Sequence, residues 1–474
     1  MATFDLYLDL KGIFENQKEK AFELRSGDQQ DRIEKLRALQ SWIRTNSQEI
    51  RDATFQDLGK PGPETDLTEI SMVLGEISHA IRHLDKWMKP KTAPNPIHFT
   101  GTNAYVQPEP KGRSLIISPW NYPFNLTVGP WVSAIAAGCT TIIKPSEFSP
   151  ATSALIASMA SSLFSPAEAS VVLGDVQVAK RLLELPFDHI FFTGSPGVGK
   201  EVMKAAANNL SSVTLELGGK SPVVVDANSD LDKAALKIAW GKSINCGQTC
   251  IAPDYVLVNK SIESAFLEKL AAAFEQLLNP RNKGIRASNS YGRIINMAHW
   301  NRLKQLMDNA VTEGAKITYG GEGQETEKYF APTILSCVDQ NMQVMNEELF
   351  GPLLPVIGYD DLDEAINVIN GKPKPLALYV FSRNRYPVQQ LAQKTSSGAL
   401  VVNDCAAHFG HPNLPFGGVN NSGIGKAHGY HGFIAFSNEK AVFQQSSRID
   451  LIKTLYPPYT LKKQKLIRLF SRFS

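Results

Sequence analysis

Residues 114–144 read SLIISPWNYPFNLTVGPWVSAIAAGCTTIIK, and this stretch sets the class of fold. It carries no charge before its last residue, yet three prolines and two asparagines interrupt it. A helix that spans a bilayer needs about 20 consecutive apolar residues, and these interruptions fit turns between short elements instead. The stretch therefore predicts a strand, a turn, a buried helix and a second strand.

The same alternation continues towards the C-terminus, where apolar β-rich runs are separated by runs with helical spacing. This order predicts a doubly wound parallel sheet that binds ligands at the carboxyl ends of its strands. Its strands are expected at residues 114–118, 140–144, 169–173, 189–193 and 211–217. A second series, at 221–226, 255–259, 353–359 and 376–382, predicts a second α/β domain beginning near Gly218. The first ninety residues have helical spacing, and residues 101–117 alternate as extended chain.

The composition excludes several classes of protein. With 474 residues, 43% hydrophobic and 20% charged, the chain can form two or three globular units, and disordered, collagenous and coiled-coil proteins are excluded. A net charge of +3 is too small to indicate a nucleic-acid partner. Five cysteines without a CxxC pair, and no apolar run at the N-terminus, predict a cytoplasmic protein.

A glycine-rich turn follows the strand expected at 189–193. In HIFFTGSPGVGKEV the strand leads into a helix, and the free N–H groups of a helix start favour phosphate. The glycines lack the GxGxxG spacing of a Rossmann fingerprint. They match GxxxxGK, but Glu201 stands where a P-loop needs Ser or Thr, which disfavours a nucleoside triphosphatase. Alone, the motif is equally compatible with a turn that binds nothing.

Three polar groups lie at other predicted strand ends or turns. Cys250 belongs to NCGQTC, Glu216 to LELGG and Asn121 to PWNYP. A thiol can act as a nucleophile, a desolvated carboxylate as a base, and an amide as a donor to an oxyanion. Taken singly, each residue could have a purely structural role. Most cysteines are small core residues, and Cys246 is a second candidate for the nucleophile beside Cys250. Together they indicate thiol-dependent oxidation of an aldehyde.

Seven motifs, in order and at similar separations, resemble those of the NAD(P)-dependent aldehyde dehydrogenase superfamily. They are PWNYPFNL (119–126), KPSE (144–147), FTGS (192–195), LELGGK (215–220), GQTC (247–250), EELFGP (347–352) and PFGGVNNSGIG (415–425). The short N-terminus, GQTCIAPDYVL and the ending RIDLIKTLYPPYT look like the class 3 and fatty aldehyde dehydrogenase branch.

The resemblance implies an aldehyde dehydrogenase-like α/β fold with a Rossmann-type cofactor domain, an α/β catalytic domain and an oligomerisation β-hairpin. The implied divisions are the cofactor domain at 1–95 and 112–217, the hairpin at 96–111, the catalytic domain at 218–417, a return to the cofactor domain with an oligomerisation strand at 418–446, and a basic tail at 447–474. The hairpin would pair with residues after 430 and extend a partner's sheet, so a homodimer is expected.

The resemblance also implies a mechanism. Cys250 would attack the aldehyde to give a thiohemiacetal, whose oxyanion is held by the Asn121 amide and the Cys250 N–H. Hydride would leave for the nicotinamide, and water activated by Glu216 would hydrolyse the thioester. The expected product is the carboxylic acid of a medium- or long-chain aliphatic or aromatic aldehyde.

By the same resemblance, NAD or NADP would lie along the strand ends. Its expected contacts are Pro119, Trp120, Lys144, Glu147, Thr193, Gly194, Ser195, Val198, Gly199, Glu348 and Phe350. Glu147 could accept from a ribose 2′-OH, which favours NAD, while NADP stays open. No metal is expected, because the histidines show no HExxH spacing.

The candidate walls of an apolar substrate pocket are Tyr122, Phe124 and Phe409. His408, His411, His428 and His431 are expected in loops or at the pocket rim.

Three other functions remain open at this point. A CoA-acylating aldehyde dehydrogenase would pass the thioester to CoA, although by the family pattern Glu216 favours hydrolysis. A thiol hydrolase would use Cys250 with a histidine and no cofactor. A silent binding protein would not need the thiol, the carboxylate and the amide together.

The C-terminal tail has helical amphipathic spacing. Leu466, Leu469, Phe470 and Phe473 fall on one face, and residues 451–474 carry six basic and no acidic side chains. Such a helix is too short to span a bilayer. It is expected either to pack on its own or the partner subunit, or to lie peripherally on an anionic membrane.

Overall fold

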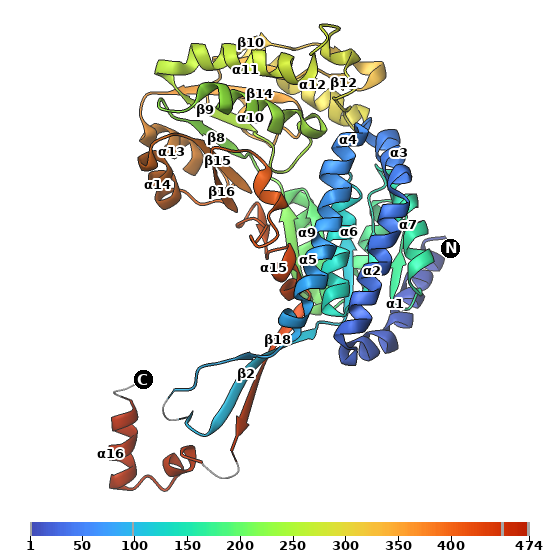
Figure 1. Ribbon diagram of the computed structural model, residues 1–474, viewed down its shortest axis with the longest axis vertical. Helices are drawn as coiled ribbons and strands as arrows, with labels where there is room; N and C mark the ends of the chain where they lie inside the picture. The colour runs from blue at the N-terminus through green and yellow to red at the C-terminus, as the bar shows by residue number, and fades with distance from the viewer. Residues whose placement is uncertain (1, 97–98, 447–449, 472–474) are drawn as a thin grey trace.

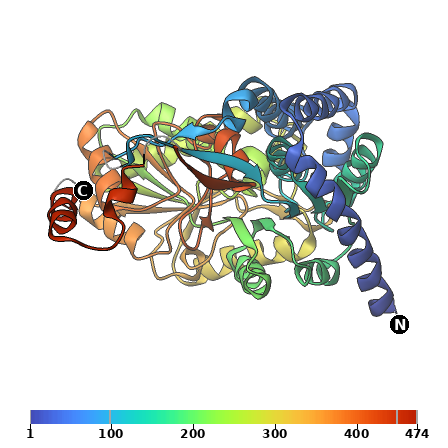
Figure 2. The same ribbon diagram turned by 90° about the horizontal axis from the view of Figure 1, so that it is seen from below.

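The computed structural model describes residues 2–96, 99–446 and 450–471. Two α/β units are stacked along the long axis, and a thin arm projects from the end opposite the second unit (Figure 1). Seen from below, the N-terminus and the C-terminus lie at opposite ends of the view (Figure 2).

The N-terminal part is helical, as predicted. It consists of α1 (Ala2–Ser26), α2 (Gln29–Thr45), α3 (Ser47–Leu58), α4 (Gly62–Thr65), a π-helical turn (Asp66–Ile70) and α5 (Ser71–Met88). The apolar residues of α2 that repeat along one face are the buried ones. The Asp28 side chain accepts from the N–H of Asp31, which caps the start of that helix.

The first unit is built on a six-stranded sheet with the order β17-β7-β6-β3-β4-β5. Its strands are β3 (Arg113–Ile117), β4 (Thr140–Lys144), β5 (Ala169–Val171), β6 (His189–Gly194), β7 (Ser212–Leu217) and β17 (Gly423–Ile424). Only the short edge strand β17 is antiparallel to its neighbour. The five strands predicted here are confirmed, with ends that differ by at most two residues.

Helices cover both faces of this sheet. They include α6 (Asn125–Ala137), α7 (Pro150–Leu163), α8 (Val176–Leu183) and α9 (Pro196–Asn209). Successive strand side chains point to opposite faces. Ile116 therefore packs in the core with α2, α5, α6 and α7, whereas Leu115 and Ile117 pack with α1, α8 and α9.

The second unit has a seven-stranded sheet with the order β10-β13-β14-β9-β8-β15-β16. Its strands are β8 (Pro222–Val225), β9 (Tyr255–Asn259), β10 (Lys316–Tyr319), β13 (Thr333–Ser336), β14 (Leu353–Tyr359), β15 (Ala377–Phe381) and β16 (Ala399–Val402). Its helices are α10 (Leu231–Ser243), α11 (Glu263–Leu278), α12 (Met297–Thr312), α13 (Leu362–Asn370) and α14 (Arg385–Lys394). The four predicted strands are confirmed, but β10, β13 and β16 were not predicted. Two of these are edge strands, and each of the three has four residues.

The arm is a pair of long antiparallel strands. β2 (Thr102–Pro110) pairs with β18 (Ser437–Gln445) over nine residues, and β1 (Lys91–Thr92) flanks β2. The expected hairpin at 96–111 is wrong in one respect, because that segment contributes a single strand. Its strand neighbours lie outside those bounds, and residues 97–98 lie outside the described residues.

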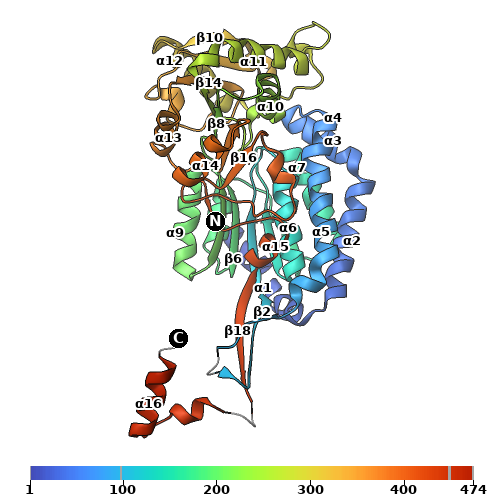
Figure 3. The same cartoon turned by 60° about the vertical axis from the view of Figure 1, so that its left-hand side comes forward.

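The chain ends in a 3-10 turn (Ile452–Leu455) and α16 (Leu461–Phe470), which follow the short helix α15 (Gly429–Ala435) and β18. α16 lies beside the arm and away from both units (Figures 1 and 3). The predicted helix is present, although Phe473 lies outside the described residues. Among the described residues, no helix is both long and apolar enough to cross a membrane.

Candidate active site

Cys250 lies in a tight turn between α10 and β9. Asn245, Cys246 and Gly247 have φ values of 49°, 53° and 72°, so the chain turns through left-handed backbone. A side chain at Gly247 would collide with the carbonyl of Gly351, which explains the glycine. Cys250 is partly exposed, whereas Cys246 is fully buried in the core, as expected of a cysteine with a structural role.

Hydrogen bonds tie this turn to the turn that carries Asn121. The Asn121 Nδ2 donates to the carbonyl of Gln248 (3.0 Å), and Asn245 Nδ2 donates to the carbonyls of Asn121 (2.7 Å) and Gln248 (3.1 Å). The Gln248 side chain donates to the carbonyl of Arg293 (2.9 Å) and accepts from the N–H of Ile295 (3.0 Å). The Asn121 amide and the Cys250 turn are therefore fixed relative to each other.

Glu216 ends β7 and lies in the same cavity as Cys250. It is buried, and neither carboxylate oxygen has a hydrogen-bond partner in the described part of the chain. Burial raises the pKa of Glu216 well above its ordinary value, although the positive charge of Lys426 acts to lower it. A carboxyl group with such a pKa can hold or accept a proton near neutral pH.

The Cys250 thiol is in an environment that disfavours its anion. Burial raises the pKa of Cys250, and the negative charges of Glu348 and Glu216 raise it further. The backbone N–H groups of Cys250 and Ile251 act in the opposite direction, so they are close enough to stabilise negative charge there. Two carboxylates and two backbone donors thus surround one thiol.

The predicted phosphate-binding residues form the start of α9. β6 ends at Gly194, and the Ser195 side chain accepts from the N–H of Val198 (3.4 Å) as the helix cap. A Cβ at Gly199 would stand 2.7 Å from Leu217, so glycine allows the helix to pack on the sheet. Free N–H groups and the helix dipole at this end fit a pyrophosphate. Thr193 precedes them and lines the cavity of Cys250.

Other predicted cofactor residues follow the neighbouring strands. Lys144 ends β4 and its Nζ lies 2.6 Å from Glu147. Trp120, which follows β3 and Pro119, packs edge-on against Phe350 with ring centroids 5.3 Å apart. Since β3, β4 and β6 are parallel, these residues and the start of α9 share one edge of the sheet.

Glu348 lies against the backbone of Gly218 and Gly219. Its Oε1 is buried without a partner in the described residues, and burial raises the pKa of Glu348 to about 8. A side chain at Gly218 would collide with this carboxylate. An unpartnered acceptor beside the thiol fits a hydroxyl donor such as a cofactor ribose.

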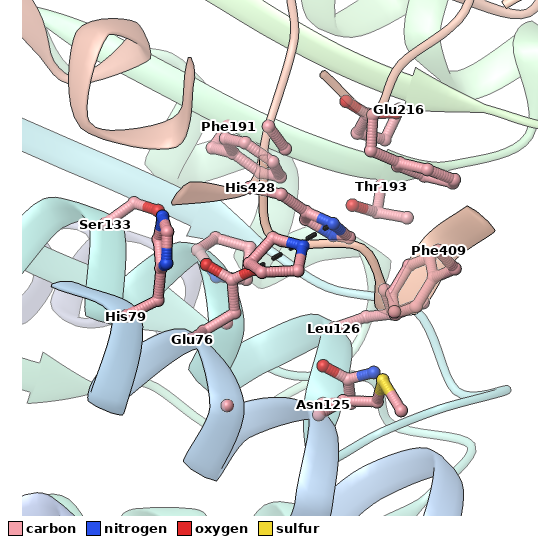
Figure 4. Close-up of a pocket in the computed structure, with 18 of the residues that line it drawn as sticks. Glu76, His79, Asn125, Leu126, Ser133, Phe191, Thr193, Glu216, Phe409 and His428 are labelled. Atoms are coloured by element: carbon pink, nitrogen blue, oxygen red, sulfur yellow. Dashed lines mark ion pairs between the residues drawn. The ribbon is translucent and has the colours of Figure 1, made fainter. Parts of the chain in front are cut away.

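Two cavities meet at Cys250. The larger, about 490 Å³, lies between α5, α6 and the segment 409–428, and Glu216 also lines it (Figure 4). His428 lies in this lining 3.9 Å from Glu76, and its ring packs against Phe409 at 4.5 Å (Figure 4). The smaller, about 300 Å³, is mainly apolar and includes Trp240.

Of the three predicted pocket walls, two line a cavity and one does not. Phe409 lines both cavities, and Tyr122 lines the smaller one, where its hydroxyl lies 2.6 Å from that of Thr249. Phe124 is a wrong prediction, because it is fully buried in the core and lines neither cavity.

Helical spacing explains this error. Phe124 and Val128 are four residues apart and both enter the core, while Asn125 and Gly129 are four apart and both line the larger cavity.

Leu126, Phe416 and His428 line the larger cavity but were not predicted as pocket walls, although the first two belong to quoted motifs.

His428 was expected only in a loop or at the rim, and His408 and His411 line neither cavity. In the described residues, no group of three or more His, Cys, Asp or Glu side chains is placed to hold a metal ion.

Known proteins are similar to this chain in sequence. The model of the aldehyde dehydrogenase family matches residues 9–442. Mouse aldehyde dehydrogenase family 3 member A2 is 42% identical over 440 residues, which are 93% of this chain and 89% of that protein. A rat protein named aldehyde dehydrogenase, dimeric NADP-preferring, is 43% identical over 434 residues, 91% of this chain and 94% of its own.

Solved structures share the fold. One described as the substrate-bound state of Staphylococcus aureus AldH has a TM-score of 0.93 and 39% identity, covering 97% of this chain and 99% of its own. An indole-3-acetaldehyde dehydrogenase in complex with NAD+ has a TM-score of 0.85 and 28% identity, covering 93% and 89%.

The buried Glu216 predicts a dependence of stability on pH. Because the pKa of Glu216 is raised in the folded state, the folded protein keeps a proton that the unfolded chain releases above about pH 4.3, and stability falls as pH rises. Glu216→Gln should remove this loss. Its gain in Tm over the unmodified protein should therefore be larger at pH 8 than at pH 5.

Differential scanning calorimetry at both pH values measures this difference. Glu201→Gln is the control, since Glu201 is an exposed carboxylate with 68% of its side chain accessible. An equal change in Tm at both pH values for Glu216→Gln would contradict the assignment.

Proposed function

The chain belongs to the aldehyde dehydrogenase family, and on this premise we propose that it oxidises an aldehyde to the carboxylic acid with NAD(P) as hydride acceptor. The 42% identity to mouse aldehyde dehydrogenase family 3 member A2 supports the resemblance of its motifs to the class 3 and fatty aldehyde dehydrogenase branch. The proposal is supported most directly by the cavity that Cys250 and Glu216 line together.

The first half of the reaction uses Cys250 and Asn121. The Cys250 sulfur attacks the carbonyl carbon and loses its proton to a neighbouring carboxylate, and the aldehyde oxygen becomes an oxyanion. Asn121 Nδ2, which has two N–H groups and uses one on Gln248, can donate the other to that oxygen, as can the Cys250 N–H. NAD(P), when bound, would supply the acceptor for the hydride that leaves the thiohemiacetal carbon, and Cys250 would then carry the acyl group as a thioester.

The second half uses Glu216. Glu216 takes a proton from water, the hydroxide adds to the thioester carbon, and the carbon–sulfur bond breaks to release the acid. The proton then passes from Glu216 to the departing sulfur, which restores the Cys250 thiol and the Glu216 carboxylate. A buried carboxylate without other partners suits this role because no hydrogen bond has to be broken before it accepts the proton.

The cofactor is proposed to follow the edge described above. The start of α9 would hold the pyrophosphate, Lys144 and Glu147 the adenosine ribose, and Glu348 the nicotinamide ribose. NAD is favoured because the Glu147 carboxylate opposes a 2′-phosphate. NADP remains compatible, since Glu147 is paired with Lys144 and a relative is named NADP-preferring.

The two cavities support an apolar aldehyde as substrate. Phe409, Leu126 and Trp240 are among their walls, which favours medium- or long-chain aliphatic or aromatic aldehydes. The second candidate reaction is transfer of the acyl group from Cys250 to CoA. The presence of Glu216, a base that can activate water, favours hydrolysis of the thioester over this transfer. A histidine-assisted hydrolase is disfavoured because Cys250 has no hydrogen bond to a histidine within the described ranges.

We propose the same division of the chain as the sequence implied, with residues 1–95 and 112–217 in the cofactor domain and 218–417 in the catalytic domain. The arm of β2 and β18 would extend a partner's sheet in a homodimer, since long paired strands that leave the body offer free edges. A relative named as dimeric supports this.

Aldehyde-dependent reduction of NAD or NADP, followed by absorbance, tests the proposed reaction. Over aldehydes from two to sixteen carbons and benzaldehyde, the protein should reduce the cofactor without added CoA. Cys250→Ala should lose this activity by at least about a thousandfold, because hydride cannot leave before the thiohemiacetal forms. Cys246→Ala is the matched control and should retain most activity.

The outcome that contradicts the proposal is an active Cys250→Ala variant together with an inactive Cys246→Ala variant that is still folded. A strict requirement for CoA would instead select the acylating reaction.

The tail suggests where the enzyme acts. We propose that α16 lies on an anionic membrane surface, because Lys462, Lys465 and Arg468 are exposed beside apolar side chains that are also exposed, such as Leu461 at 77% and Leu469 at 50%. Each basic residue near such a surface is worth about 1 kcal/mol.

Sedimentation with anionic liposomes compares the full chain with one that ends at Tyr459. The full chain should pellet with phosphatidylserine vesicles and the shortened chain should stay in solution, with neutral vesicles as control. Equal behaviour of both chains would support packing of α16 on a subunit and would overturn the membrane assignment.

A further inference from the structure

A buried ion pair lies beneath the turn that carries Asn121. Lys60, in the loop between α3 and α4, pairs with Glu69 of the π-helical turn Asp66–Ile70. Both side chains have 0% exposure. Two charged groups without access to water are costly to bury, so their other contacts indicate what they do.

Each partner has a second contact on the Asn121 turn. Lys60 Nζ donates to the carbonyl of Asn121 (3.2 Å) and lies 4.2 Å from the centroid of the Tyr122 ring. The Glu69 Oε2 accepts from the N–H of Asn125 (2.8 Å). The cation therefore holds the beginning of the turn and the anion holds its end, where α6 starts.

The carbonyl of Asn121 is also a point where two supports meet. It accepts from Lys60 Nζ on one side and from Asn245 Nδ2 (2.7 Å) of the Cys250 turn on the other. With its carbonyl fixed twice, the backbone of Asn121 has little freedom to rotate. The direction of its side-chain amide then depends on these contacts.

Stability alone is a weak reason for such a pair. Apolar residues of similar volume often replace a buried ion pair at no cost, whereas removing one partner leaves an unpaired charge. The π-helical turn that supplies Glu69 is also a rare conformation that is frequently found at functional sites. Both points favour a role in orientation.

We propose that Lys60 and Glu69 are positioning residues for catalysis, which aim the Asn121 amide at the oxygen of the bound aldehyde. This inference rests on the proposed function, since it needs Asn121 to donate to the oxyanion. The pair should then affect formation of the thioester, which develops that oxyanion, and should leave cofactor binding unchanged.

The test is a double-mutant cycle on the full-length enzyme. Lys60→Met with Glu69→Gln removes both charges at once, and the Gln oxygen can still accept from the N–H of Asn125. The rate constant of the burst of reduced cofactor should fall about ten- to a hundredfold. The affinity for NAD, measured by fluorescence titration in the absence of aldehyde, should not change.

The same pair of changes in an Asn121→Ala background separates orientation from general structure. If the pair acts through the amide, the burst should be no slower than in Asn121→Ala alone. Lys35→Met with Glu168→Gln is the matched control, because that partly buried ion pair (24% and 13% exposed) does not contact the Asn121 turn. It should leave the burst rate constant unchanged both in the unmodified enzyme and in the Asn121→Ala background.

Three outcomes would overturn the inference. The first is a burst rate constant in the Lys60→Met and Glu69→Gln variant that equals that of the unmodified enzyme. The second is a further slowing of the burst when these changes are combined with Asn121→Ala, and the third is a weaker affinity of the Lys60→Met and Glu69→Gln variant for NAD. If Asn121→Ala itself has a normal burst, the proposed role of Asn121 fails and the inference fails with it. Should the double variant not fold, Lys60→Arg keeps the charge and is expected to show a smaller loss of the same kind.

Discussion

The hydrogen bond from the Asn121 amide to the carbonyl of Gln248 joins the two halves of the protein at the place where the chemistry would occur. Asn121 follows a strand of the first sheet, and Gln248 precedes a strand of the second. Neither sheet positions the thiol and the amide by itself. The site therefore exists only because two turns, 127 residues apart in the chain, are held together by buried polar contacts. Buried groups of this kind are costly unless each has a partner, and Asn245, Gln248 and Asn121 supply several of these partners to one another.

The charges near Cys250 are mostly negative. Burial raises the pKa of Glu216 and of Glu348, the latter to about 8. The partly buried carboxyl of Glu64 accepts from the N–H of Asn245 (2.8 Å) in the same turn, and desolvation raises its pKa to about 7. Desolvated carboxyls that can exchange protons near pH 7 are suited to take a proton from a thiol or from water. The oxidised nicotinamide ring is cationic, and positive charge beside the thiol would lower the pKa of Cys250.

Much of the fold could be predicted from the sequence because buried parallel strands are continuous runs of Val, Ile and Leu. Asn121 and Glu216 follow or end such runs, and parallel strands bring their carboxyl ends to one edge, whereas Cys250 precedes β9 of the second sheet and meets them only where the two units touch. The edge strand β10 (KITY) has mostly exposed side chains and gave no apolar run, whereas β16 (ALVV) is apolar but only four residues long, which is too short to stand out as a strand. Phe124 was misplaced because the sequence does not state where α6 begins, and one residue of shift turns a wall of the pocket into a core residue. Lys60 and Glu69 were not predicted, because each is an ordinary surface residue type whose burial depends on tertiary contacts.

The most direct measurement is the intact mass of a Glu216→Gln variant mixed with an aldehyde and NAD, followed by peptide mapping. If Cys250 forms the thioester and Glu216 activates the water that removes it, the variant should accumulate one acyl group per chain on the peptide that contains Cys250. An acyl group on Cys246, or reduced cofactor formed in the first turnover with no acyl group on any cysteine, would contradict the account.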